Sequence, residues 1–149
     1  MQQPQLASPK GASSAAYDHT VVLVVDDDVD VADALTAFLS ARGLEVCGSN
    51  DPREALLTLD RMPSISVVVS DLRMPGMDGL TFAAEAQRRR APSDALAVIL
   101  ITAHATAESA EAATKGGIFA FMQKPFHPQR LVETIRDAHL SAMARREPV

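Results

Sequence analysis

Residues 67–79 have the sequence VVVSDLRMPGMDG, and this stretch decides the predicted fold. A run of three valines leads through a serine to a single acid, Asp71, and the chain then breaks into proline and glycine. A short apolar run bounded by turn residues predicts a buried strand, so Asp71 should lie at its carboxyl end. In open parallel α/β sheets, ligands bind at this edge. An aspartate that only starts a turn fits these residues equally well, so the rest of the chain has to decide.

The size and charge of the chain exclude several classes of protein. Its 149 residues suit one domain with a substantial core. The net charge of −5 argues against direct binding of nucleic acid, and the run Arg88-Arg89-Arg90 is interpreted as a solvated helix end. No apolar run approaches the roughly 18 residues that a membrane span requires. The only cysteine, Cys47, precludes an internal disulfide and fits a cytoplasmic location.

Three segments are expected along the chain. Residues 1–19 are rich in Gln, Pro, Ser, Ala and Gly, which predicts a flexible N-terminal tail. Residues 20–146 should form the folded domain, and residues 147–149 its C-terminal end.

The folded segment alternates between apolar runs and amphipathic stretches. Strands are predicted at residues 21–25, 44–48, 65–70, 96–101 and 118–122, and a helix should follow each of them. This alternation predicts a parallel sheet with helices on both faces. For five strands the flavodoxin-like order 2-1-3-4-5 is the leading candidate. It places the first and third strands side by side, so that Asp26, Asp27 and Asp71 converge.

Three consecutive acids, Asp26, Asp27 and Asp28, directly follow the first strand. One acid would serve the N-terminus of the next helix, but three exceed that need and favour a binding site. Carboxylates gathered in one crevice repel each other unless a cation lies among them. No Cys or His lies nearby in sequence, so the oxygen ligands favour a hard divalent ion such as Mg²⁺.

A hydroxyl and an amine complete the set of groups at the strand ends. Thr102 ends the fourth strand, where its hydroxyl could bond a phosphoryl oxygen. Lys124 lies at the end of the fifth, and lysine is a common phosphate ligand. Each also has an ordinary interpretation, as a strand threonine and a solvent-facing lysine. The Lys124–Pro125 peptide is a candidate for the cis form. A nucleophile, a metal site and two phosphoryl ligands together indicate phosphoryl transfer.

Four motifs, VVDDD at 24–28, DLRMPGMDG at 71–79, ITA at 101–103 and KPF at 124–126, resemble the receiver domain of two-component response regulators. The resemblance spans about residues 20–143. It implies that Asp71 accepts a phosphoryl group from a sensor histidine kinase or a histidine phosphotransfer protein. Asp26 and Asp27 would hold Mg²⁺ together with Asp71 and the backbone carbonyl of Arg73. Such a domain catalyses its own phosphorylation and dephosphorylation and is not a conventional turnover enzyme.

The resemblance also implies a switch. Lys124 would pair with the phosphoryl group, and Thr102 would bond it and shift on phosphorylation. Phe121 matches the aromatic residue that turns inward as Thr102 moves, although its residue type alone indicates a plain core aromatic. Arg73 and His104 occupy positions that tune the lifetime of the aspartyl phosphate. The expected output surface covers residues 106–143 and would control a downstream protein partner, a missing output domain or a phosphorylation-dependent homodimer.

Three alternatives remain at this point. A haloacid-dehalogenase-like phosphatase also starts with a strand and an Asp, but it needs an acid pair after the lysine, where only Glu133, Asp137 and Glu147 occur. A non-catalytic interaction module with the same fold would lack the acceptor or the lysine, and both are present. Finally, the chain is either a stand-alone receiver or the excised receiver of a longer regulator such as a transcription factor.

Overall fold

A computed structural model describes residues 20–146 of the chain. The predicted tail, residues 1–19, and the segment 147–149 lie outside the described residues. The strands are β2 (Val21–Val25), β3 (Glu45–Ser49), β4 (Val67–Asp71), β5 (Ala97–Thr102) and β6 (Ala120–Gln123). The helices are α2 (Val29–Ser40), α3 (Pro52–Arg61), α4 (Gly79–Arg89), α5 (Ala107–Lys115) and α6 (Pro128–Arg146), with a short 3-10 turn η1 (Pro92–Asp94).

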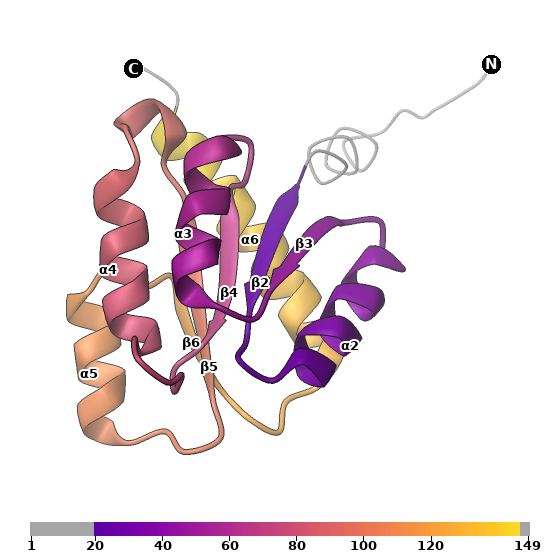
Figure 1. Ribbon diagram of the computed structural model, residues 1–149, viewed down its shortest axis with the longest axis vertical. Coiled ribbons are helices and arrows are strands. Elements are labelled where there is room, and N and C mark those ends of the chain that lie inside the picture. The colour runs from indigo at the N-terminus through magenta and orange to yellow at the C-terminus, as the bar shows by residue number, and fades with distance from the viewer. Residues whose placement is uncertain (1–19, 147–149) are drawn as a thin grey trace.

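The five strands form one parallel sheet in the order β3-β2-β4-β5-β6 (Figure 1). This is the predicted order 2-1-3-4-5, so the flavodoxin-like fold is confirmed. Strand β2 lies between β3 and β4, and Val25 is opposite Ser70 in the register. The ends of β2 and β4 therefore meet at the carboxyl edge of the sheet.

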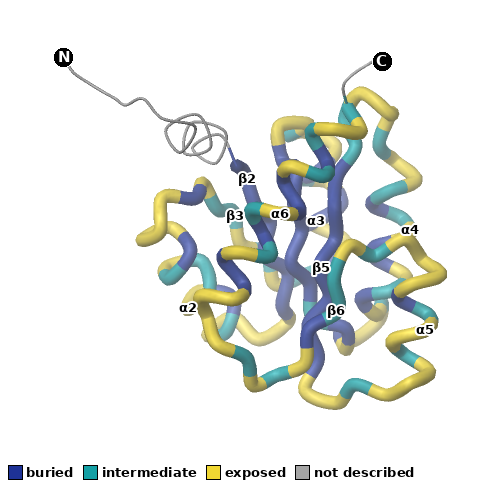
Figure 2. Tube along the Cα trace, turned by 180° about the vertical axis from the view of Figure 1, so that it is seen from behind, coloured by how far each residue is buried: buried dark blue, intermediate teal, exposed yellow. Residues whose placement is uncertain are grey.

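Helices cover both faces of the sheet and divide the core into two layers. One layer joins β-strand side chains such as Leu23 and Leu100 to residues of α3, α4 and α5, including Phe82. The other joins alternate strand residues such as Val24 and Ile99 to residues of α2 and α6. In Figure 2 the central strands are dark blue along most of their length. Burial on both faces explains why their sequences are continuously apolar.

Local capping fixes where the helices begin. Asp28, Asp51, Asp78 and Thr106 are the N-caps of α2, α3, α4 and α5, and each side chain accepts a hydrogen bond from a backbone N–H of the first turn. The last strand differs from its prediction, because it begins at Ala120 and not at residue 118. There the Ile118 N–H still bonds back to the Ala113 carbonyl and closes α5.

The interpretation of Arg88-Arg89-Arg90 as a solvated helix end is wrong for Arg90. Its half-buried guanidinium donates to five backbone carbonyls, those of Leu59, Met62, Pro63, Ile65 and Asp94. Arg146 donates to Ile65 and Asp94 as well, and to Ala95. Burial and the nearby Arg146 lower the pKa of Arg90. The two arginines thus tie the ends of α3, α4 and α6 together at the amino edge of the sheet. None of the helices within residues 20–146 combines the length and apolarity needed to cross a membrane.

Candidate functional site

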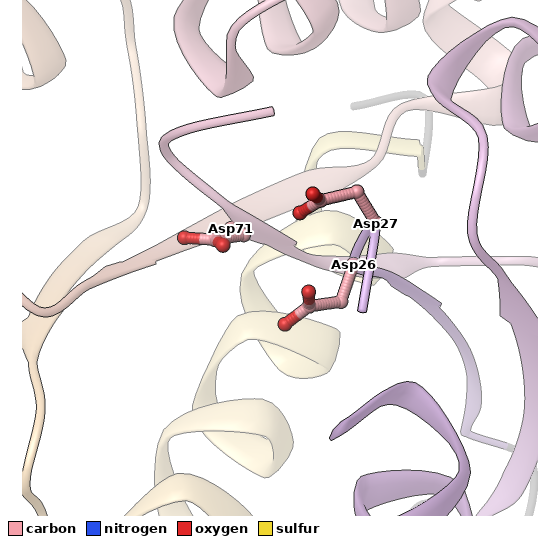
Figure 3. A group of neighbouring side chains, drawn as sticks. All are labelled: Asp26, Asp27 and Asp71. Carbon is pink, nitrogen blue, oxygen red and sulfur yellow. The ribbon is translucent and has the colours of Figure 1, made fainter. Parts of the chain in front are cut away.

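Three carboxylates converge where β2 and β4 end, as the strand order predicted (Figure 3). Asp26 and Asp27 follow β2, and Asp71 is the last residue of β4. One oxygen from each of the three lies within 4.8 Å of the others. Asp26 is buried, Asp71 is half-buried and Asp27 is exposed, so the cluster opens from the sheet edge to solvent.

The backbone holds Asp26 in one orientation. Its N–H donates to the Ser49 carbonyl at 3.1 Å, which continues the pairing with β3 beyond the strand. Its Oδ1 accepts from the Asp28 N–H at 2.9 Å. Asp28 caps a helix instead, because its own Oδ1 accepts hydrogen bonds from the N–H groups of Asp30 and Val31 at the start of α2. Of the three consecutive acids, two therefore join the cluster and the third caps the helix.

The electrostatics of the cluster favour a bound cation. Burial raises the pKa of Asp26 above its usual value, and repulsion from Asp71 and Asp27 raises it further. The Asp28 N–H and the positive charge of Lys124 act in the opposite direction without cancelling this rise. A cation among the three carboxylates would relieve both the burial penalty and the repulsion. The donor set consists of carboxylate oxygens, which suits a hard divalent ion.

Thr102 ends β5 and Lys124 directly follows β6, the two strands beyond β4. Thr102 is buried at the end of β5, and its Oγ1 accepts from the His104 N–H at 3.1 Å. The Thr102 carbonyl accepts from the Lys124 N–H at 2.8 Å, which joins the two positions through the backbone. Lys124 is half-buried and is followed by a cis peptide bond to Pro125, the form that its sequence suggested. The positive charge of Lys124 acts to lower the pKa of Asp26, so Lys124 interacts electrostatically with the acid cluster.

The loop after Asp71 is held by contacts that the sequence did not reveal. The buried Ser70 hydroxyl donates to the Asp71 carbonyl oxygen at 2.9 Å. The Gly79 N–H donates to the Leu72 carbonyl at 2.7 Å, which closes the loop at its base. The Arg73 N–H lies 3.5 Å from Asp71 Oδ1, so Arg73 begins the loop next to the carboxylate.

The two glycines of this loop serve different purposes. Gly76 has a φ of +82°, an angle that glycine adopts more readily than other residues. Gly79 does not have a positive φ. A Cβ atom at Gly79 would lie 2.4 Å from the Asp71 carbonyl oxygen and 2.9 Å from Leu72 Cα. Gly79 is therefore required by space, and no local sequence signal distinguishes the two reasons.

Phe121 lies in the middle of β6, opposite Leu100. It is half-buried and packs against the core layer formed with α3, α4 and α5. It lies three residues before Lys124, which directly follows the strand. The two candidate switch residues, Thr102 and Phe121, therefore occupy the neighbouring strands β5 and β6, of which β6 is the edge strand.

Comparison with known proteins identifies the family of the chain. A family model of the response regulator receiver domain matches residues 22–136. The C4-dicarboxylate transport transcriptional regulatory protein DctD of Pseudomonas aeruginosa is 40% identical over 126 residues, covering 83% of this chain and 26% of that protein. The transcriptional regulatory protein FixJ of Bradyrhizobium diazoefficiens is 34% identical over 119 residues, covering 78% of this chain and 55% of that protein.

Solved structures agree with this result. The response regulator receiver domain protein from Clostridium thermocellum superposes with a TM-score of 0.72 at 29% identity, over 85% of this chain and 96% of that structure. The chain spans only part of the length of the two curated relatives above, because each continues beyond the matched region. The sequence motifs, the strand order and these matches agree, and the chain belongs to the response regulator receiver domain family.

Proposed function

We propose that Asp71 accepts a phosphoryl group from a phosphohistidine of a sensor histidine kinase or a histidine phosphotransfer protein. The observation that carries this proposal is the cluster of Asp26, Asp27 and Asp71 at adjoining strand ends, with the charge of Lys124 beside it. Asp71 is the half-buried acid of the three on the central strand β4, so an incoming group can reach it from solvent. The cytoplasm is the location that goes with this function.

The reaction follows from the groups around Asp71. A carboxylate oxygen of Asp71 attacks the phosphorus, the P–N bond to the donor imidazole breaks, and its electron pair returns to the ring nitrogen. Asp26, Asp27, Asp71 and the backbone carbonyl of Arg73 would hold Mg²⁺. The ion would supply neutralisation of the charge on the phosphoryl oxygens. The Lys124 ammonium pairs with the transferred group and lowers the repulsion between that group and the acids.

Phosphorylation would be converted into a surface change through Thr102. Its hydroxyl, which accepts from the His104 N–H in the present arrangement, would turn to donate to a phosphoryl oxygen. Phe121 would then repack inward behind it. The surface affected is formed by α5, β6 and α6, and it would contact a downstream partner, an output domain or a second copy of the chain. Because relatives such as DctD are longer than the matched region, an excised receiver remains compatible with this proposal.

The phosphatase alternative is not retained. The receiver family match covers residues 22–136, and Glu133 and Asp137 lie within α6, away from the N-terminal end of that helix. The strand ends themselves supply one acid cluster, that of Asp26, Asp27 and Asp71. A receiver should take up one phosphoryl group and lose it slowly, without repeated turnover of a phosphomonoester.

The test is intact-protein mass spectrometry after incubation with acetyl phosphate and Mg²⁺. We expect a single labile phosphoryl adduct that a chelator prevents. Asp71→Asn should abolish it, whereas Asp78→Asn, a control in the same loop that keeps an N-cap side chain, should retain it. An adduct of normal yield in Asp71→Asn would refute the assignment, and so would an adduct that forms equally well without metal.

A further inference from the structure

A groove of about 580 Å³ runs between α3 and α4, the two helices that lie side by side over one face of the sheet (Figure 1). Its floor is apolar and is formed mainly by Leu56, Leu57 and Met77. Leu56 is buried in the core, but Leu57 leaves 50% of its surface exposed and Met77 is half-buried. A single exposed leucine needs no explanation, whereas one that lines a groove with other apolar side chains indicates a binding surface.

The rim of the groove is basic. Arg53 lies on α3, and Arg88 and Arg89 lie on α4. Arg88 and Arg89 both bond the Glu85 carboxylate, and these hydrogen bonds lower the pKa of Glu85 to about 2. Arg89 also pairs with Asp60, which lies outside the lining, at 2.8 Å. Among the residues described, Arg53 takes part in none of the salt bridges. Three arginines thus face one glutamate in the lining, in a chain whose net charge is −5.

We propose that this groove docks an acidic segment of a partner protein. Aliphatic side chains of the segment would enter between the helices onto Leu57 and Met77, and its carboxylates would face the arginine rim. An amphipathic helix presents its apolar and charged side chains in this way. A symmetric contact with a second copy of the chain is disfavoured, because it would bring the two arginine rims together. A nucleic acid would use the arginines but would have little use for the apolar floor.

The groove is separate from the α5, β6 and α6 surface. It nevertheless reaches the loop that follows Asp71. Met77 of the lining belongs to that loop, and the N–H of Thr81, another lining residue, donates to the side chain of Asp78, the N-cap of α4. A bound segment would therefore contact the loop directly. Docking itself requires no change at Asp71, so it does not depend on the proposed phosphorylation.

Two labelled helical peptides of about 15 residues provide the probes. Both carry leucines on one face, and the other face is glutamate in one peptide and lysine in the other. Because the whole chain is acidic, non-specific attraction favours the lysine peptide. Fluorescence anisotropy should instead show saturable binding of the glutamate peptide. Arg53→Glu reverses an exposed charge, and Leu57→Ser removes an apolar contact. Each variant should weaken that binding about five- to tenfold.

Matched variants on other helices serve as controls. Lys115→Glu changes an exposed charge on α5, and Leu140→Ser changes a leucine on α6 with 43% of its surface exposed. Both should bind like the unchanged protein, and so should Asp71→Asn. Thermal unfolding of each variant verifies that it is folded.

Four results of the binding experiments would overturn the proposal. They are preference for the lysine peptide, absence of binding at millimolar concentration, equal weakening by the control variants, and binding of single-stranded DNA that depends on Arg53 but not on Leu57. A dimer in gel filtration that Leu57→Ser dissociates would assign the groove to a second copy of the chain, and this result would also refute the proposal.

Discussion

Replacement of Gly79 by alanine should damage both the fold and the chemistry at Asp71. The new Cβ would lie 2.4 Å from the Asp71 carbonyl oxygen, well inside van der Waals contact, and its two nearest neighbours, this oxygen and Leu72 Cα, are backbone atoms. Relief requires the Asp71–Leu72 backbone to move by the better part of an ångström, against the hydrogen bonds that join Gly79 to Leu72 and Leu72 to Ile101. Overpacking of this kind lowers the free energy of unfolding by about 1–3 kcal/mol. The better helix propensity of alanine offsets at most about 1 kcal/mol of that loss.

The assay pairs thermal unfolding with the initial rate of acetyl phosphate labelling. For a domain of this size, about 1–3 kcal/mol corresponds to a fall in Tm of roughly 3–15 °C. Displacement of the acceptor by part of an ångström should slow labelling about 10- to 100-fold. Gly43→Ala is the matched control, because its φ of +89° makes alanine unfavourable while no atom lies within 4 Å of the added Cβ. Gly43→Ala should lose about 1 kcal/mol of stability and keep its labelling rate. Unchanged Tm and labelling rate in Gly79→Ala would refute the steric argument.

Two further variants test the charges of the fold. The raised pKa of Asp26 means that the folded state holds this proton more tightly than the unfolded chain, so in metal-free buffer stability should fall as pH rises from the usual carboxyl pKa through the raised one. Asp26→Asn should flatten that dependence, raise Tm by a few degrees near pH 7 in metal-free buffer and reduce the stabilisation by Mg²⁺. Thermal melts with and without chelator measure both effects. A Tm of Asp26→Asn below that of the unchanged protein in metal-free buffer near pH 7 would contradict the reasoning. Arg90→Ala should reduce the unfolding free energy by about 2–4 kcal/mol in urea titrations, because several backbone carbonyls lose their donor. Arg88→Ala, whose side chain is 71% exposed, should change it by less than about 1 kcal/mol, and equal losses in the two variants would argue against the role of Arg90.

The strand order and the meeting of the acids could be predicted because both depend on short-range signals that the sequence carries. Continuous apolar runs at β2, β4 and β5 indicate strands covered on both faces, and that burial requires helices between them. Once the order is known, the residues that end β2 and β4 must be neighbours. The position of Asp71 next to Asp26 follows without any knowledge of side-chain packing.

The remaining details depend on contacts between distant segments. Arg88, Arg89 and Arg90 look alike in sequence, but only Arg90 is placed where the carbonyls at the end of α3 come within reach. Asp28 cannot be told from its two neighbours until the backbone of α2 shows which side chain caps it. Gly79 reads as a flexible turn residue, whereas the close approach of the Asp71 carbonyl is a consequence of tertiary packing.

Two groups of acids in this chain have opposite effects on stability. Asp28, Asp51 and Asp78 each cap a helix and stabilise it, as is usual for acids at these positions. Asp26 is only 5% exposed, takes part in none of the salt bridges among residues 20–146, and faces two further carboxylates. An arrangement that opposes folding, in a chain whose capping acids favour it, is typical of a functional site. The cluster should therefore gain more stability from a divalent cation than any other group of acids in the described part of the chain, which makes metal-dependent stability a direct measure of its role.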